Sequence, residues 1–177
     1  ALYAGSHAKA SYIDDGVSLG PDHDFVANMF EHAPGVTITR EQTLTLENDI
    51  SYIDVLFSFD GKLWRTRVHS KRYDAKYAAI DFTTRYPHPL TMLTSRQRLS
   101  LAKSELIRYS RLVTNVRFLA QAASDLYHNL LAKGYPAGEL GAAFYRAVQS
   151  LSTQHSLRAN KDTLHKLICG ARMTQEW

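Results

Sequence analysis

The spacing of hydrophobic residues divides the chain into two halves that meet near residues 86–95. Before this boundary apolar residues alternate with polar ones, which is typical of half-buried strands. After it they recur every three or four residues, which is typical of amphipathic helices. The pattern therefore predicts an α+β chain, with an antiparallel sheet first and a helical bundle second.

Three segments of the first half predict elements of this sheet. Residues 11–19, SYIDDGVSL, predict two short strands around an acidic turn. Residues 21–35 predict one helix, opened by a proline and closed by Pro34–Gly35. Residues 36–46 alternate again and predict two more strands.

Residues 51–70 carry a hairpin signal. Asp60–Gly61 lies between two alternating runs, and a two-residue hairpin turn needs residues that tolerate positive φ. The returning strand alternates between two faces, one with Trp64, Thr66 and Val68 and the other with Arg65, Arg67 and His69. This predicts a basic outer face, which is either a binding surface or an ordinary edge with solvated arginines.

The rest of the chain predicts a connector and four helices. Residues 71–90 mix basic and aromatic residues, and Pro87 and Pro89 favour an extended segment that its aromatic side chains anchor to the core. Helical spacing covers 96–113, then runs to Lys133–Gly134 after capping residues Thr114 and Asn115. A third helix is predicted up to Leu151, and a weaker one over 162–173.

Composition narrows the possible functions. No apolar run reaches the roughly 18 residues of a membrane span, so we expect no membrane partner. Cys169 is the only cysteine, which excludes an internal disulfide and a cysteine-based zinc site. The first residues lack an initiator Met and an apolar signal core, so we expect the true start upstream.

Charge is distributed unevenly along the chain. Residues 1–90 carry 9 Lys/Arg and 12 Asp/Glu, whereas residues 91–177 carry 12 and 5, so their formal charges are −3 and +7. A basic half beside an acidic half indicates one surface for phosphates and another for metals or a different partner. Two ordinary domains with different solvated faces would give the same totals.

Five short motifs follow one another in a familiar order. They are Tyr12–Asp15, Ser51–Asp54, Lys71–Asp74, Arg108–Arg111 and Gly134–Tyr135. Together they resemble the C-terminal half of a retroelement-type reverse transcriptase, over roughly positions 10 to 150. The resemblance implies a partial palm with its Y-x-D-D box in residues 1–90 and a helical thumb in 91–151. It leaves 152–177 as a helical tail of unknown role.

The resemblance implies two kinds of site. Asp14 and Asp15 would be the catalytic carboxylates and would bind Mg²⁺ for two-metal nucleotidyl transfer. The 52–69 hairpin would hold the primer end, and basic side chains would hold duplex phosphates without reading bases. The candidates for nucleic-acid binding are Arg65, Arg67, Lys71, Arg72, Arg96, Arg98, Lys103, Arg108, Arg111 and Arg117, of which Arg108 and Arg111 come first.

The chain also departs from the family. A two-metal palm needs another Asp from an upstream strand, as well as the fingers that bind the incoming nucleotide, and residues 1–11 are too few to contain them. Gly16 and Val113–Thr114 stand where the family has a bulkier apolar residue and a Cys-Ser pair. The chain alone therefore does not complete a polymerase site.

Three functions remain open. The favoured one is a non-catalytic subunit that binds RNA or an RNA/DNA duplex in a larger ribonucleoprotein, for example an organellar ribosome, in a mitochondrion or other organelle. The second is one half of a split RNA-directed DNA polymerase, whose fingers and remaining palm come from another chain. The third is a helical interaction protein without nucleic acid.

Overall fold

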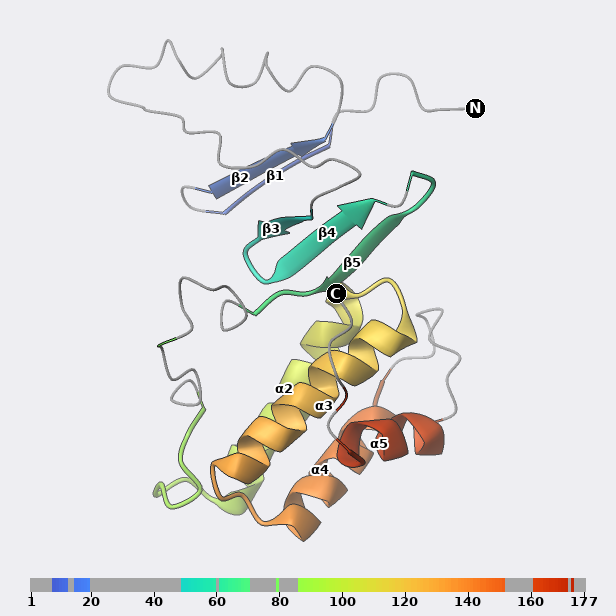
Figure 1. Cartoon of the computed structure of the whole chain (residues 1–177). Helices are drawn as coiled ribbons and strands as arrows, with labels where there is room; N and C mark the ends of the chain where they lie inside the picture. Colours follow the sequence, from blue (N-terminus) through green and yellow to red (C-terminus); the bar gives the residue numbers. More distant parts are fainter. Residues whose placement is uncertain are drawn as a thin grey trace, which may run out of the picture. The chain divides into compact units, whose positions relative to one another are not determined.

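A computed structural model describes residues 8–12, 15–19, 49–59, 61–70, 79, 86–151, 161–171 and 173 (Figure 1). For 8–12 and 15–19 it describes the backbone. The helix predicted at 21–35, the strands predicted at 36–46 and most of the connector lie outside these residues. The chain divides into two compact units, residues 1–64 and 65–177.

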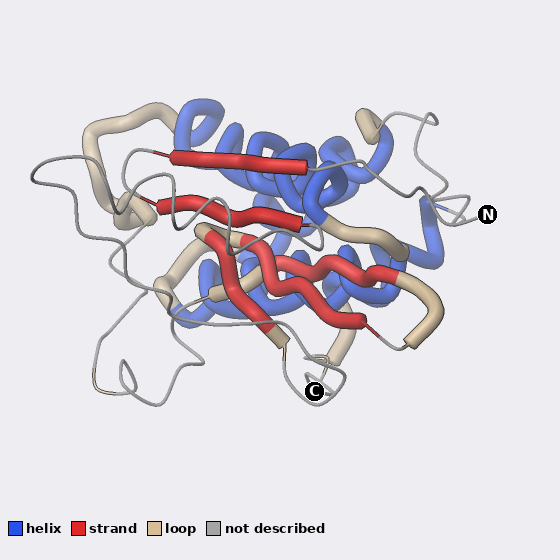
Figure 2. The backbone as a smooth tube through the Cα atoms, turned by 90° about the horizontal axis from the view of Figure 1, so that it is seen from above, coloured by secondary structure: helices blue, strands red, loops and turns tan. Residues whose placement is uncertain are grey.

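The described strands precede the described helices along the chain, as the α+β prediction requires. Figure 2 marks the strands in red and the helices in blue. Strands β1 (Ala8–Tyr12) and β2 (Asp15–Leu19) form an antiparallel pair. Strands β3 (Ile50–Tyr52), β4 (Val55–Phe59) and β5 (Trp64–Val68) form a second sheet in the order β3-β4-β5. Within the described ranges, four helices follow. They are α2 (Ser95–Leu112), α3 (Val116–Ala132), α4 (Ala137–Gln149) and α5 (Lys161–Cys169).

The quartet Ser-Tyr-Ile-Asp occurs twice, at 11–14 and 51–54, and in both copies its Ser-Tyr pair ends the first strand of an antiparallel pair. Tyr12 pairs with Asp15 across β1 and β2, and Tyr52 pairs with Val55 across β3 and β4. In each hairpin the two residues between the paired strands are Ile-Asp. The strands predicted around the YIDD turn are confirmed, and Asp15 is the first residue of β2.

The hairpin prediction for residues 51–70 needs two corrections. The run 51–59 was expected to be one strand, but a turn at Ile53–Asp54 splits it into β3 and β4. The next connection is also longer than the two-residue turn expected at Asp60–Gly61, because β4 ends at Phe59 and β5 begins at Trp64. Gly61 does adopt a positive φ of 87°, as expected of a turn glycine.

Ile53 adopts a φ of 55°, a conformation that β-branched residues strongly disfavour. Its side chain is 41% exposed, so little burial offsets this strain. We expect Ile53→Gly to raise the free energy of unfolding of the β3–β4 hairpin by about 1 kcal/mol, measured as a higher urea midpoint. Ile50→Gly, in the adjoining strand, is the matched control and should lower it. A loss of stability in Ile53→Gly would show that the Ile53 backbone is not strained.

The four described helices share one hydrophobic core. In it α2 packs on α3 and α4, and α5 packs on α3 and α4 (Figure 1). The most deeply buried large side chains are Leu106, Leu119, Leu130, Leu140, Phe144 and Ile168. They come from all four helices, in agreement with the helical bundle predicted for the second half of the chain.

Local signals set the ends of these helices. Thr94 and Gln97 form a reciprocal capping box at the start of α2, and the Asn115 side chain accepts from the Phe118 N–H at 3.0 Å at the start of α3. After α3, Gly134 takes a φ of 95°, which favours glycine at that stop. None of the helices that the structure describes is long and apolar enough to cross a membrane.

The helix predicted at 162–173 is observed as α5, and it belongs to the same core. Leu164 and Ile168 are buried in it. Two histidines contact backbone carbonyls around this helix: His165 Nε2 lies 3.0 Å from the Gly141 oxygen, and His128 Nε2 lies 3.0 Å from the Gly170 oxygen. The last described helix is therefore tied to α3 and α4 by apolar and polar contacts.

Candidate nucleic-acid interface

Three hydrogen bonds join β5 to the link between α2 and α3. The Thr66 N–H donates to Thr114 Oγ1 at 3.1 Å. The Thr66 carbonyl oxygen accepts from the Thr114 N–H at 3.1 Å and from Thr114 Oγ1 at 3.3 Å. Thr114, predicted as a helix-capping residue, instead fixes the strand, and Asn115 is the cap. We call this contact the strand–helix junction.

Four predicted nucleic-acid ligands flank the strand–helix junction. Arg65 and Arg67 adjoin Thr66, while Arg111 and Arg117 lie three residues before and after Thr114. Arg65, Arg111 and Arg117 are exposed, and Arg67 is half-buried. Tertiary contacts thus place cations from two distant parts of the sequence at one junction.

The basic outer face predicted for β5 is only partly present. His69 is buried and Arg67 is half-buried, whereas Trp64, expected on the inner face, is 49% exposed. Val68, at the end of β5, packs against the helical core. Burial therefore increases along β5 on both of its faces. Within the predicted basic face, Arg65 is exposed, Arg67 is half-buried and His69 is buried.

A row of exposed cations runs along α2, which we call the basic stripe: Arg96, Lys103 and Arg111. Their spacing of seven and eight residues places them on one face of the helix. Glu105, the only acidic residue of α2, falls on the opposite side by the same geometry. At about 1.5 Å per residue, the stripe extends over roughly 22 Å of helix axis.

Two other arginines of α2 bind groups of this chain instead. Arg108 makes a two-point contact with Glu105 Oε2, from Nε at 3.1 Å and from Nη2 at 2.6 Å, and its guanidinium lies 5.1 Å from the centre of the Tyr109 ring. Arg98 donates to the carbonyl oxygens of Thr91 and Leu93 and to Ser95 Oγ. By contrast, the basic stripe has no ion-pair partner within the described ranges.

The first turns of α2 and α3 favour anions. Neither contains an acidic residue, although each carries an exposed arginine: Arg96 in α2 and Arg117 in α3. The amino end of a helix has a partial positive charge, so these cations add to it and do not offset it. A bound phosphate would relieve this repulsion beside Arg96, at the start of α2.

The remaining predicted site residues lie in or beside undescribed segments. Lys71, Arg72 and Asp14 are outside the described residues, and Asp15 is described by its backbone alone. Among the described residues, no group of three or more His, Cys, Asp or Glu could hold a metal ion. The Mg²⁺ site expected at Asp14 and Asp15 therefore stays a prediction.

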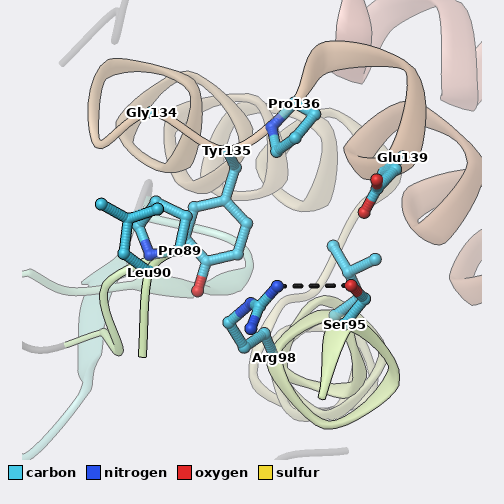
Figure 3. Close-up of a pocket in the computed structure, with 9 residues that line it drawn as sticks. Pro89, Leu90, Ser95, Arg98, Gly134, Tyr135, Pro136 and Glu139 are labelled. Carbon is cyan, nitrogen blue, oxygen red and sulfur yellow. Dashed lines mark hydrogen bonds between the residues drawn. The ribbon is translucent and has the colours of Figure 1, made fainter. Parts of the chain in front are cut away.

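A cavity of about 250 Å³, absent from the sequence predictions, lies where α2 begins and α3 ends (Figure 3). Arg98, Leu99, Tyr135 and Glu139 are among the residues that line it. Its walls are braced by the Tyr135 hydroxyl, which donates to the Pro87 carbonyl oxygen at 2.8 Å, and by Lys133, which donates to the Tyr86 carbonyl oxygen. Tyr86 is half-buried against the core, as expected for an aromatic anchor of the connector.

Cys169 and His165 resemble a nucleophile and its base, but their environment opposes that role. Sγ of Cys169 lies 3.3 Å from His165 Nε2, which also contacts the Gly141 oxygen. Burial raises the pKa of the Cys169 thiol from 9.0 to about 11, against a smaller lowering by a hydrogen bond with Tyr127. Catalytic thiols have lowered pKa values, so this pair is structural.

The raised pKa of Cys169 predicts a loss of stability in alkali. Below pH 9 the Cys169 thiol keeps its proton in both the folded and the unfolded chain. Above pH 9 the unfolded chain releases this proton first, so the free energy of unfolding falls as the pH approaches 11. Burial also raises the pKa of Tyr109 above 10, in the same direction. Urea unfolding of the wild type and Cys169→Ala between pH 8 and 10 should show a smaller fall in the free energy of unfolding for the variant. Equal falls in the two proteins would show that the Cys169 thiol does not cause the loss.

Comparison with protein-family models, with curated proteins and with solved structures gives no match for this chain.

Proposed function

We propose that this chain is a reverse-transcriptase-derived palm–thumb fragment that binds RNA or an RNA/DNA duplex as a non-catalytic subunit of a larger ribonucleoprotein. The observation that carries the proposal is the basic stripe of α2. Arg96, Lys103 and Arg111 lie on one acid-free face and have no ion-pair partner in the described part of the chain. A regular row of cations suits the phosphates of a nucleic acid.

The stripe and the strand–helix junction together support binding by charge. Arg65 and Arg117 flank the junction near the carboxyl end of α2, where Arg111 ends the stripe. Flexible cations on an open helix face position a duplex without reading its bases, because sequence is read by fixed side chains in the grooves. We therefore expect binding to depend strongly on salt and weakly on sequence.

The proposal is tested by measuring the affinity of the purified chain for fluorescent RNA duplexes of two unrelated sequences between 50 and 200 mM KCl. If three phosphates are bound, log K should fall against log salt with a slope of about −2 to −3, similar for both sequences. A slope near zero would show that phosphate contacts do not drive binding and would overturn the proposal.

The YIDD hairpin favours a second candidate, one half of a split RNA-directed DNA polymerase. The pairing of Tyr12 with Asp15 brings the end of β1 beside the start of β2 within the YIDD motif, which supports this candidate. Asp14 and Asp15 would then hold Mg²⁺ together with a carboxylate from another chain.

Asp14→Ala separates the two candidates. In a split enzyme, Mg²⁺-dependent primer extension in the presence of the complementing chain should disappear in Asp14→Ala, with RNA affinity unchanged. In a non-catalytic subunit, Asp14→Ala should leave assembly and RNA binding as they are, and no extension should be detected with the wild type.

A further inference from the structure

The loop before α2 exposes an unusual amount of apolar surface. Leu90 is 87% exposed, Met92 104% and Leu93 43%. These are three of the eight exposed large hydrophobic residues in the described ranges, and they lie within four positions of one another. We call residues 89–93 the apolar loop. Clustered exposed apolar side chains mark an interaction site more often than isolated ones do.

The backbone of the apolar loop is nevertheless held in place. The Thr91 N–H donates to the His88 carbonyl oxygen at 3.0 Å, and the Leu90 N–H donates to His88 Nδ1 at 3.2 Å. Arg98 donates from α2 to the carbonyl oxygens of Thr91 and Leu93. The capping box of Thr94 then fixes the next residue. The apolar side chains are therefore presented to solvent by an ordered backbone, which lowers the entropy cost of binding.

The polar and basic surroundings of the loop indicate its partner. Arg96 follows Thr94 by two residues and begins the basic stripe, so the apolar loop and the stripe meet at the amino end of α2. Pro89 and Leu90 also border the cavity in Figure 3, together with Tyr135 and Pro136. Leu90 and Met92 are thus placed near the amino end of α2, where the basic stripe begins.

We propose that the apolar loop is a wedge, through which Leu90 and Met92 contact exposed base faces where the stacking of a bound duplex is interrupted. This rests on the proposed function, because the basic stripe holds the duplex. Leucine and methionine are among the apolar side chains that proteins insert between base steps. Unstacked bases in RNA occur at bulges, nicks and ends. The substrate class is therefore an RNA-containing duplex with a bulge, nick or end beside the amino end of α2.

The test uses the full chain and two RNA duplexes of equal length, one continuous and one with a single bulged 2-aminopurine. We expect the bulged duplex to bind roughly tenfold more tightly, equivalent to about 1.4 kcal/mol, with a change in 2-aminopurine fluorescence. The double variant Leu90→Ser/Met92→Ser should lose this preference and the fluorescence change, but keep the salt slope. Leu167→Ser is the matched control, since Leu167 is 45% exposed on α5, and it should behave as wild type.

Arg98→Gln adds a test of the loop's support. Arg98 positions the loop and does not bind phosphate, so its replacement should reduce the bulge preference and leave the salt slope unchanged. Circular dichroism would confirm that both variants keep the helical bundle.

Each alternative outcome overturns the wedge and has a distinct meaning. If the double variant keeps the bulge preference, the apolar loop does not contact bases, although the salt slope would still support the proposed function. If it loses only self-association in sedimentation, or only binding to vesicles of anionic phospholipid, the loop binds protein or membrane. If wild-type binding shows neither salt dependence nor bulge preference, the proposed function fails with it.

Discussion

Reversing the charge of the basic stripe should abolish RNA binding. In Arg96→Glu/Lys103→Glu/Arg111→Glu, three exposed cations that face one way become anions, which repel phosphates. We expect the affinity for an RNA duplex at 50 mM salt to fall by at least about 100-fold, because three phosphate contacts are lost. Each lost contact should also reduce the salt slope by about one unit. Fluorescence anisotropy across a salt series measures both quantities.

The control for this prediction is another pair of exposed cations on the same bundle. Arg146→Glu/Lys166→Glu changes the net charge as much as Lys103→Glu/Arg111→Glu does, but on α4 and α5. The α2 pair should weaken binding far more than the α4–α5 pair. Equal losses would mean that only net charge matters, and the stripe would not be the binding face.

Arg108→Ala has a different expected result, although Arg108 was a leading candidate by sequence. The Arg108 guanidinium already pairs with the Glu105 carboxylate. Replacing Arg108 with Ala therefore leaves Glu105 without this partner and lowers mainly the local stability of α2. The structure therefore shifts the expected binding role along the helix from Arg108 to Lys103.

Phe144→Ala should cause the largest loss of stability among single substitutions in the helical bundle. Phe144 is fully buried, and its ring packs edge-on against Tyr127 with centroids 5.3 Å apart. Removing a buried phenyl group leaves a cavity and costs about 3–5 kcal/mol of unfolding free energy. Urea unfolding followed by far-ultraviolet circular dichroism would measure this loss.

Tyr145→Ala is the matched control for Phe144→Ala. Tyr145 is the next residue of α4, but it is 38% exposed; its ring meets the His165 ring at 5.2 Å, and its hydroxyl donates to Asp162 Oδ1 at 3.4 Å. We expect it to cost no more than about 1.5 kcal/mol. Similar losses in both variants would contradict the assignment of Phe144 to the centre of the core.

Local chemistry made much of the fold predictable. The α2 start follows from the Thr94–Gln97 box, and the α3 stop from Gly134, because each signal acts between residues a few positions apart. The hairpin around YIDD was also predictable from alternation and a short polar turn. The turn at Ile53–Asp54 was missed because its positive φ falls on isoleucine, which no local preference favours there.

By itself, the sequence determined the order of strands and helices, the helical core and the cations that could take part in a nucleic-acid interface. The folded structure decided which cations remain available, for Arg98 and Arg108 through oxygens nearby in the sequence and for Arg67 through burial in the tertiary structure. Arg98 and Arg108 are engaged by carbonyls and by Glu105, and Arg67 is half-buried, whereas Arg96, Lys103 and Arg111 stay exposed on one face. The physical reason is that a guanidinium binds the nearest carbonyl or carboxylate oxygens, and folding decides which oxygens those are. The pairing of Tyr12 with Asp15 likewise follows from the local alternation in SYIDDG.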